Sequence, residues 1–95
     1  MSKATRTVMD VVYSSEGKEI NIADKQVVFR KELIDKFVEC RKKRGWTQQE
    51  LSKRSGITRS NITRFESGRY NPTLEMLVRV ATALEAELDF NIELQ

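Results

Sequence analysis

Four polar residues between positions 59 and 64 carry side chains suited to hydrogen bonding with base-pair edges. They are Arg59, Ser60, Thr63 and Arg64. At about 100° per helical residue these side chains share one arc, with Ile62 and Phe65 on the opposite side. An arginine on such an arc can donate two hydrogen bonds to O6 and N7 of a guanine. The alternative is an ordinary amphipathic surface helix that happens to carry two arginines.

Basic residues are concentrated around this arc. Residues 41–69 contain nine basic and two acidic residues, whereas residues 70–95 contain one basic and five acidic residues. Residues 1–40 are balanced at seven of each, and the whole chain has a net charge of only +3. A basic segment of this kind is typical of a surface that binds a polyanion, although charge runs are more often solvated faces.

The composition excludes several classes of protein. A chain of 95 residues accommodates about one small domain. Cys40 is the only cysteine and there is no histidine, so the chain cannot form its own disulfide and lacks the usual zinc ligands. No apolar run exceeds three residues, which excludes a membrane span and the core of a signal peptide. We expect a cytoplasmic protein without metal or cofactor and, without a glycine-rich phosphate loop, not an enzyme.

Four helices are expected to position the polar arc. The first begins near Arg30, because apolar residues then recur three or four apart, and it ends at Gly45. Thr47 and Glu50 form a capping box that starts a short second helix. Thr58 caps the third helix over residues 59–66. The fourth starts at Pro72-Thr73, and its expected apolar face is Leu74, Leu77, Val78, Ala81 and Leu84.

Both ends of the chain show the period of a β-strand. The segments Val8–Tyr13 and Lys18–Ile22 flank a turn and suggest a hairpin, with a loosely ordered arm as the alternative. Near the other end, Leu88, Phe90, Ile92 and Leu94 alternate with polar residues. Because a lone strand leaves its backbone unpaired, this strand is expected to pair with a second copy or with residues 7–22.

The region from Leu33 to Leu88 resembles the lambda-repressor/Cro-like family of helix-turn-helix domains, also called XRE type. Family motif positions are occupied by Arg41 and Gly45, the segment Thr47–Leu51, Gly56–Arg59, Ile62–Gly68 and Asn71–Leu74. The departures are Ser52, where the family usually has alanine, and Phe65, where an aliphatic residue is common. The resemblance implies a mainly α domain of four to five helices. The alternating segments would add a C-terminal β-strand after this domain and a short hairpin before it.

The resemblance also implies residue roles. Arg59, Ser60, Thr63 and Arg64 would read bases in the major groove of double-stranded DNA. Contacts to DNA phosphates are implied for Thr47, Gln48, Asn61, Arg69, Tyr70 and Asn71. Arg41 and Glu66 would form an ion pair between the first and third helices. For residues 42–44, a solvated helix end and phosphate contact remain equally open.

The terminal strand is similar to that of HigA-type or HipB-type antitoxins, which dimerise and bind both operator DNA and a toxin. The expected organisation is an extension over residues 1–29, a DNA-binding domain over 30–85 and a dimerisation strand over 86–95. The strand's apolar residues Leu88, Phe90, Ile92 and Leu94 would form the homodimer interface. The leading interpretation is a dimeric repressor of an inverted-repeat operator, and the alternative is an antitoxin that also binds a toxin protein.

Overall fold

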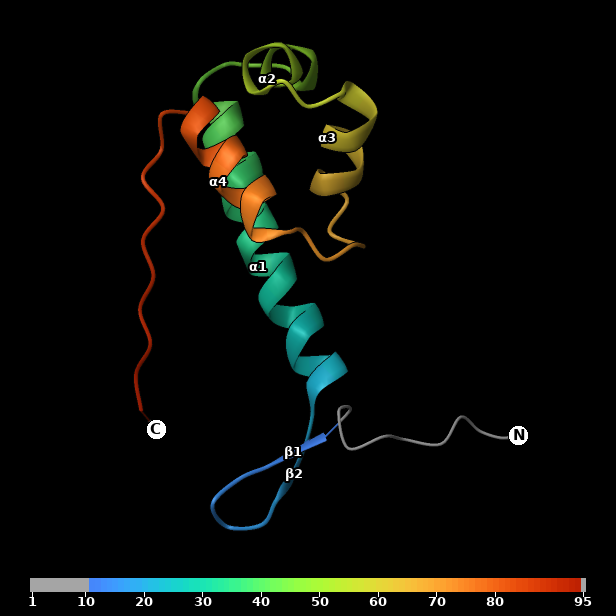
Figure 1. Ribbon diagram of the computed structural model, residues 1–95, viewed down its shortest axis with the longest axis vertical. Helices are drawn as coiled ribbons and strands as arrows, with labels where there is room; N and C mark the ends of the chain where they lie inside the picture. The colour runs from blue at the N-terminus through green and yellow to red at the C-terminus, as the bar shows by residue number, and fades with distance from the viewer. Residues whose placement is uncertain (1–10, 95) are drawn as a thin grey trace, which may run out of the picture.

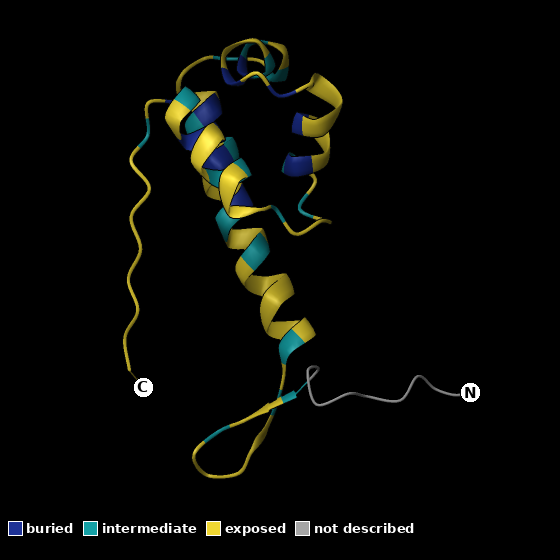
Figure 2. Ribbon diagram, viewed as in Figure 1, coloured by how far each residue is buried: buried dark blue, intermediate teal, exposed yellow. Residues whose placement is uncertain are grey.

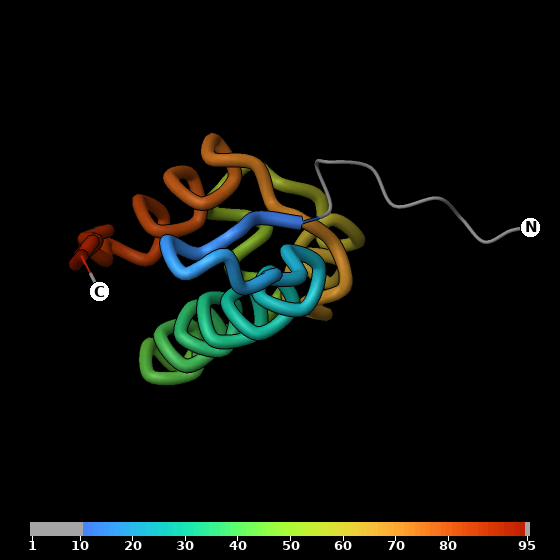
Figure 3. Tube along the Cα trace, turned by 90° about the horizontal axis from the view of Figure 1, so that it is seen from below, coloured from blue at the N-terminus to red at the C-terminus, as the bar shows by residue number. Residues whose placement is uncertain are grey.

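The computed structural model describes residues 11–94, which are mainly helical as expected. The elements are strands β1 (Val11–Tyr13) and β2 (Glu19–Asn21), and helices α1 (Ile22–Lys43), α2 (Gln48–Ser55), α3 (Arg59–Glu66) and α4 (Leu74–Ala83). In Figure 1, α4 overlaps the upper half of α1 in projection, α2 crosses the top and α3 lies to one side, and Figure 3 shows α1 and α4 as separate rows in the perpendicular view. The lower half of α1 projects away from this body toward the hairpin. Within residues 11–94, no helix is long and apolar enough to cross a membrane.

The N-terminal hairpin is confirmed for the residues that the structure describes. Strands β1 and β2 are antiparallel, with Val12 opposite Ile20. The Ser14 hydroxyl accepts hydrogen bonds from the backbone N–H groups of Glu16 and Lys18, at 3.3 and 3.0 Å. A serine that bonds the backbone of following residues favours a turn over continued strand, so the turn is built locally. Val8 and the rest of residues 1–10 lie outside the described residues.

Helix α1 begins eight residues before the expected position near Arg30, so the boundary expected after residue 29 falls within a helix. Asn21 caps it, because its side-chain oxygen accepts from the backbone N–H of Asp24 at 3.1 Å. The added turns are mostly exposed, as Figure 2 shows, and Phe29 is 68% exposed. A helical stripe in the sequence reflects burial against a core, and within residues 11–94 these turns face no core.

The core lies between the upper half of α1 and the three short helices. Buried apolar residues come from all four helices and from the turn between α2 and α3: Ile34, Phe37, Leu51, Ile57, Ile62, Phe65, Val80, Ala81 and Leu84. The rings of Phe37 and Phe65 meet edge to face, with centroids 5.4 Å apart. Phe65, which is larger than the residue usual at this position in the family, is therefore accommodated by an aromatic pair across α1 and α3.

Threonine side chains cap the three short helices. Thr47, Thr58 and Thr73 accept from the backbone N–H groups three residues ahead, at 3.1 to 3.2 Å. These caps confirm the expected starts of α2, α3 and α4. The second half of the expected capping box differs, because the carboxylate of Glu50 accepts from Nε of Arg54. An arginine one helical turn ahead offers this carboxylate a charged donor.

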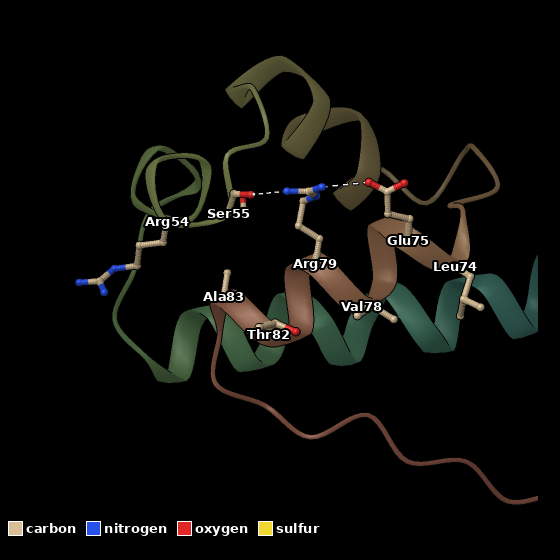
Figure 4. Close-up of a pocket in the computed structure, with 8 residues that line it drawn as sticks. All are labelled: Arg54, Ser55, Leu74, Glu75, Val78, Arg79, Thr82 and Ala83. Carbon is tan, nitrogen blue, oxygen red and sulfur yellow. Dashed lines mark hydrogen bonds and ion pairs between the residues drawn. The ribbon is translucent and has the colours of Figure 1, made fainter.

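The apolar face expected on α4 is partly wrong. Leu74 and Val78 are 74% and 49% exposed, whereas Val80 is completely buried. Figure 4 shows Leu74 and Val78 beside an open hollow, with Arg79 reaching from α4 toward Ser55 and Glu75. Apolar residues cover more than one side of α4, and its packing against α1 and α2 decides which side is buried.

The C-terminal strand expected over residues 86–94 is absent from the part of the chain that the structure describes. This segment is extended but unpaired, and β1 pairs with β2 rather than with it. It runs away from the end of α4, on the opposite side of the α1–α4 pair from α3 (Figures 1 and 3). Phe90, Ile92 and Leu94 are at least 84% exposed, and Leu88 is 43% exposed. A strand is defined by its pairing, and the described part of one chain supplies none.

Candidate nucleic-acid interface

Helix α3 presents a polar face to solvent and an apolar face to the core. Its exposed side chains include Arg59, Ser60, Thr63 and Arg64, while Ile62 and Phe65 are buried. The four residues that share an arc in the sequence are therefore all accessible on one short helix. The hydroxyl of Ser60 lies 3.2 Å from that of Thr58, at the N-terminus of the helix.

A buried ion pair fixes α3 to α1. Nε and Nη2 of Arg41 donate to the two carboxylate oxygens of Glu66, at 2.6 and 2.9 Å. Nη1 of Arg41 donates to the carbonyl oxygen of Trp46 at 2.7 Å. The two side chains are only 10% and 7% exposed. A paired fork of this kind holds both distance and orientation, so it sets how α3 projects from the body.

Gln48 joins this ion pair to the exposed face of α3. Its amide nitrogen donates to Glu66 and its amide oxygen accepts from the hydroxyl of Thr63, both at 2.9 Å. An amide nitrogen carries two hydrogens, so one donor of Gln48 remains for a further acceptor. The first turn of α2 and the middle of α3 are thereby held together at the surface.

Two serines hold the turn between α2 and α3. The hydroxyl of Ser52 donates to the carbonyl oxygen of Ile57 at 2.5 Å, and that of Ser55 accepts from the Ile57 backbone N–H at 3.2 Å. Gly56 ends α2 with a φ of +75°, a conformation that favours glycine. Ser52, which departs from the family's usual alanine, therefore satisfies a backbone carbonyl of this turn.

The loop after α3 brings further predicted residues to the same region. Asn61, Arg64, Tyr70 and Asn71 line a hollow of about 220 Å³ between α3 and the start of α4. The guanidinium carbon of Arg64 lies 3.8 Å from the centre of the Tyr70 ring. Arg69 is exposed and follows Gly68 at the start of the loop.

Arg30 also holds the loop after α3, although the sequence pattern does not predict this role. From α1, its Nε donates to the carbonyl oxygen of Gly68 at 2.7 Å, and its Nη1 donates to the side-chain oxygen of Asn71 at 2.6 Å. The amide nitrogen of Asn71 is left to donate elsewhere. No local signal identifies Arg30, because the residues it holds are about 40 positions away along the chain.

The acidic residues of the basic segment are paired inside it. Glu66 pairs with Arg41 and Glu50 pairs with Arg54, so residues 41–69 keep seven cations in excess. Arg44 donates to the carbonyl oxygen of Leu84 at 2.9 Å, which gives it a structural contact at the end of α4. Arg59 and Arg69 have no ion-pair or hydrogen-bond partner for their side chains within residues 11–94. Of these two free cations, Arg59 lies on the exposed face of α3 and Arg69 lies in the loop that follows the helix.

Comparisons with known proteins match the region that contains α2 and α3. A family model described as helix-turn-helix matches residues 38–91. An uncharacterised HTH-type transcriptional regulator of Methanothermobacter thermautotrophicus is 49% identical over 49 residues, which are 52% of this chain and 71% of the relative. A second such regulator, from Archaeoglobus fulgidus, is 39% identical over 51 residues, which are 54% of this chain and 73% of the relative.

A further relative has a more specific name. The antitoxin HipB of Escherichia coli is 38% identical over 48 residues, which are 50% of this chain and 54% of that protein. No solved structure matches the chain significantly. Since the family model covers more than half of the chain, and α2, the turn at Gly56 and α3 have the expected geometry, the protein belongs to the XRE-type helix-turn-helix family.

Proposed function

We propose that the protein is a sequence-specific regulator of transcription that binds double-stranded DNA, acts as a repressor, and reads an inverted-repeat operator as a homodimer. The observation that carries this proposal is the exposed face of α3, held by the buried Arg41–Glu66 pair. A short basic helix fixed rigidly to a body fits the major groove. Selection of bound sites from a random DNA pool tests the proposal, and enrichment of an inverted repeat is expected.

The residues divide into two proposed roles. Arg59, Ser60, Thr63 and Arg64 contact bases, because their side chains are exposed on one face of α3. Contacts to phosphates are proposed for Thr47, Gln48, Asn61, Arg69, Tyr70 and Asn71. The spare amide donors of Gln48 and Asn71 support this second role, since each side-chain oxygen already accepts from within the protein.

The two roles predict different mutant behaviour. Arg64→Ala and Arg59→Ala should each lose about 1–3 kcal/mol on the selected site and relax the preference at one base pair per half-site. Gln48→Ala should weaken binding to all sequences alike, because a phosphate contact carries no sequence information. Competition binding against sites changed at each base pair in turn measures both effects.

A matched control removes a surface arginine outside α3. Arg79→Ala removes an exposed pair with Glu75 on α4 and a long contact of 3.5 Å with the carbonyl oxygen of Ser55, and it should leave the base preference unchanged. If Gln48→Ala changed the base preference and Arg64→Ala did not, α3 would not be the helix that reads the groove.

The dimer proposal rests on apolar side chains that one chain leaves uncovered. Phe90, Ile92 and Leu94 are at least 84% exposed, and the backbone of this extended segment pairs with no other strand among the described residues. An apolar groove of about 280 Å³ lies where the segment leaves the body, lined in part by Leu33 on α1 and Leu88. Antiparallel pairing of two such segments would satisfy both backbones and cover both strips. It would also fix two α3 helices about 34 Å apart, one turn of the duplex.

Alanine at Phe90 and Ile92 together should weaken dimerisation by at least about 100-fold. Each of these side chains contributes about 1.5–3 kcal/mol when buried, and a dimer holds two copies of each. Alanine at Asp89 and Asn91, on the other side of the alternation, is the matched control and should leave the dimer intact. Sedimentation with and without DNA measures the oligomer directly.

Truncation after Leu84 gives a second test of the interface. It removes the whole segment, and it should yield a folded monomer because the fully buried core residues end at Leu84 and only the partly buried Ala86 packs against the core beyond it. A truncated protein that remained dimeric, with unchanged affinity for the inverted repeat, would show that residues 86–94 are not the dimer interface.

The second candidate function is that of an antitoxin, favoured by the similarity to HipB and by the exposed, acidic C-terminal segment. In this case the segment, or the N-terminal extension, also binds a basic toxin protein. A small reading frame for a toxin-like protein beside the gene, whose product co-purifies with this chain, would favour the antitoxin. A dimer that binds its operator fully and has no such neighbour would favour the autonomous repressor.

A further inference from the structure

The two arginines on the exposed face of α3 are held differently. The guanidinium of Arg64 lies over the ring of Tyr70, with 3.8 Å between its central carbon and the ring centre. Arg59 has no contact of this kind in the described part of the chain. Both Arg64 and Tyr70 are exposed, and Tyr70 is 47% exposed. The contact therefore forms at the surface proposed to meet DNA.

The contact with Tyr70 leaves the guanidinium of Arg64 able to bind a base as well. A ring under a guanidinium uses the face of the cation and leaves the N–H donors at its edge free. Arg41 shows the opposite case, because its donors are directed to Glu66 and to the carbonyl oxygen of Trp46. Recognition of a guanine needs two N–H donors in one plane. A ring that holds the guanidinium plane of Arg64 in place reduces the side-chain entropy that is lost when the arginine binds.

The loop that carries Tyr70 is itself held on both sides. Arg30 donates to the carbonyl oxygen of Gly68 at 2.7 Å and to the side chain of Asn71 at 2.6 Å. These two residues bracket Tyr70 in the chain. Arg30 lies in the part of α1 that precedes the matched helix-turn-helix region, residues 38–91. The loop that carries the ring is thus held by a residue outside the matched helix-turn-helix region.

We propose that Tyr70 is a specificity-determining residue that acts by positioning Arg64, and that Arg30 supports it by holding the Gly68–Asn71 loop. The inference rests on the proposed function and adds to it. The Tyr70 hydroxyl is free to contact a phosphate, whereas its ring sharpens the guanine preference of Arg64. Tyr70 then affects base choice without touching a base.

Two substitutions separate the ring from the hydroxyl. Tyr70→Leu removes the ring and should reduce discrimination at the base pair read by Arg64 by about two- to fivefold, with other positions unchanged. Tyr70→Phe keeps the ring and should retain the wild-type preference, although affinity for all sequences falls if the hydroxyl meets a phosphate. Arg64→Ala fixes the upper limit of the effect at the same base pair. Binding competition between the selected site and its single-base variants provides the readout.

Arg30 is tested by a matched pair of neighbouring substitutions. Arg30→Ala frees the loop and should reduce discrimination at the same base pair as Tyr70→Leu. Lys31→Ala removes a cation one residue away whose partner is Asp35, and should leave the preference unchanged. If both substitutions left base preference at the wild-type level, the support assigned to Arg30 would be refuted.

A measurement without DNA tests the contact by itself. The side-chain methylene protons of Arg64 should show an upfield ring-current shift in the NMR spectrum of the wild type and Tyr70→Phe, lost in Tyr70→Leu. The absence of this shift in the wild type would refute the inference. The inference would also be refuted if the wild type selected a DNA site and the Tyr70→Leu variant showed the same base preference on that site. A wild type that selected no DNA sequence would refute the proposed function and the reading role together, while the NMR shift would still report the contact.

Discussion

Replacement of either Arg41 or Glu66 by alanine is expected to lower the free energy of unfolding by about 3–5 kcal/mol. Each substitution leaves the other side chain as an unpaired charge that is almost completely buried, since the two side chains are 10% and 7% exposed. Loss of Arg41 also leaves the Trp46 carbonyl without its donor, and loss of Glu66 removes an acceptor of Gln48. Urea denaturation followed by circular dichroism measures the change.

An exposed ion pair on α1, the helix that carries Arg41, provides the control. Lys31 and Asp35 lie 3.1 Å apart on α1 but are 75% and 64% exposed. Lys31→Ala should therefore cost less than about 1 kcal/mol. The double variant Arg41→Met with Glu66→Leu should lose much less stability than the two single alanine variants combined, because it leaves no buried charge. Strictly additive losses in a double-mutant cycle would argue against coupling between these residues.

DNA binding is expected to weaken about 1000-fold between 50 and 200 mM salt, if a dimer neutralises about six phosphates. The logarithm of the association constant should then fall with that of the salt concentration at a slope near −5. The physical reason is the release of counterions from DNA by the cations around α3. Fluorescence anisotropy on the selected site, over a series of salt concentrations, measures the slope.

Two variants that each remove one cation locate the contacts. Arg69→Ala should make the slope shallower by about 1.8 per dimer, because one phosphate contact is lost in each protomer. Lys25→Ala, in the half of α1 that projects away from the body, should leave the slope unchanged. A slope near zero for the wild type would rule out DNA as the polyanion, and equal effects of the two variants would show that net charge alone matters.

Local chemistry explains which features the sequence predicted well. A threonine caps the backbone N–H three residues ahead, so the starts of α2, α3 and α4 depend on short segments only. The two faces of α3 follow from its period, with Ile62 and Phe65 buried and the polar arc exposed. The hairpin turn likewise depends on hydrogen bonds within residues 14–18.

Features that depend on distant packing were predicted less well. The sequence placed Leu74 and Val78 on the buried face of α4, but the fit of this helix against α1 and α2 buries Val80 instead. The start of α1 differs from the expected one because its first turns are mostly exposed within the described part of the chain and show no apolar stripe. The terminal strand was expected from its alternation alone, yet a strand needs a neighbour, and residues 11–94 of one chain provide none.

The sequence by itself determined the helix-turn-helix motif, the caps of its helices and the residue types on the exposed face of α3. Each of these depends on residues within one or two helical turns, where period and capping act. Only the tertiary structure decided that Arg30 holds the loop at Gly68 and Asn71, and that Arg64 lies over Tyr70. Such contacts join side chains from separate elements, and which of many exposed arginines finds a partner is set by how those elements pack in space.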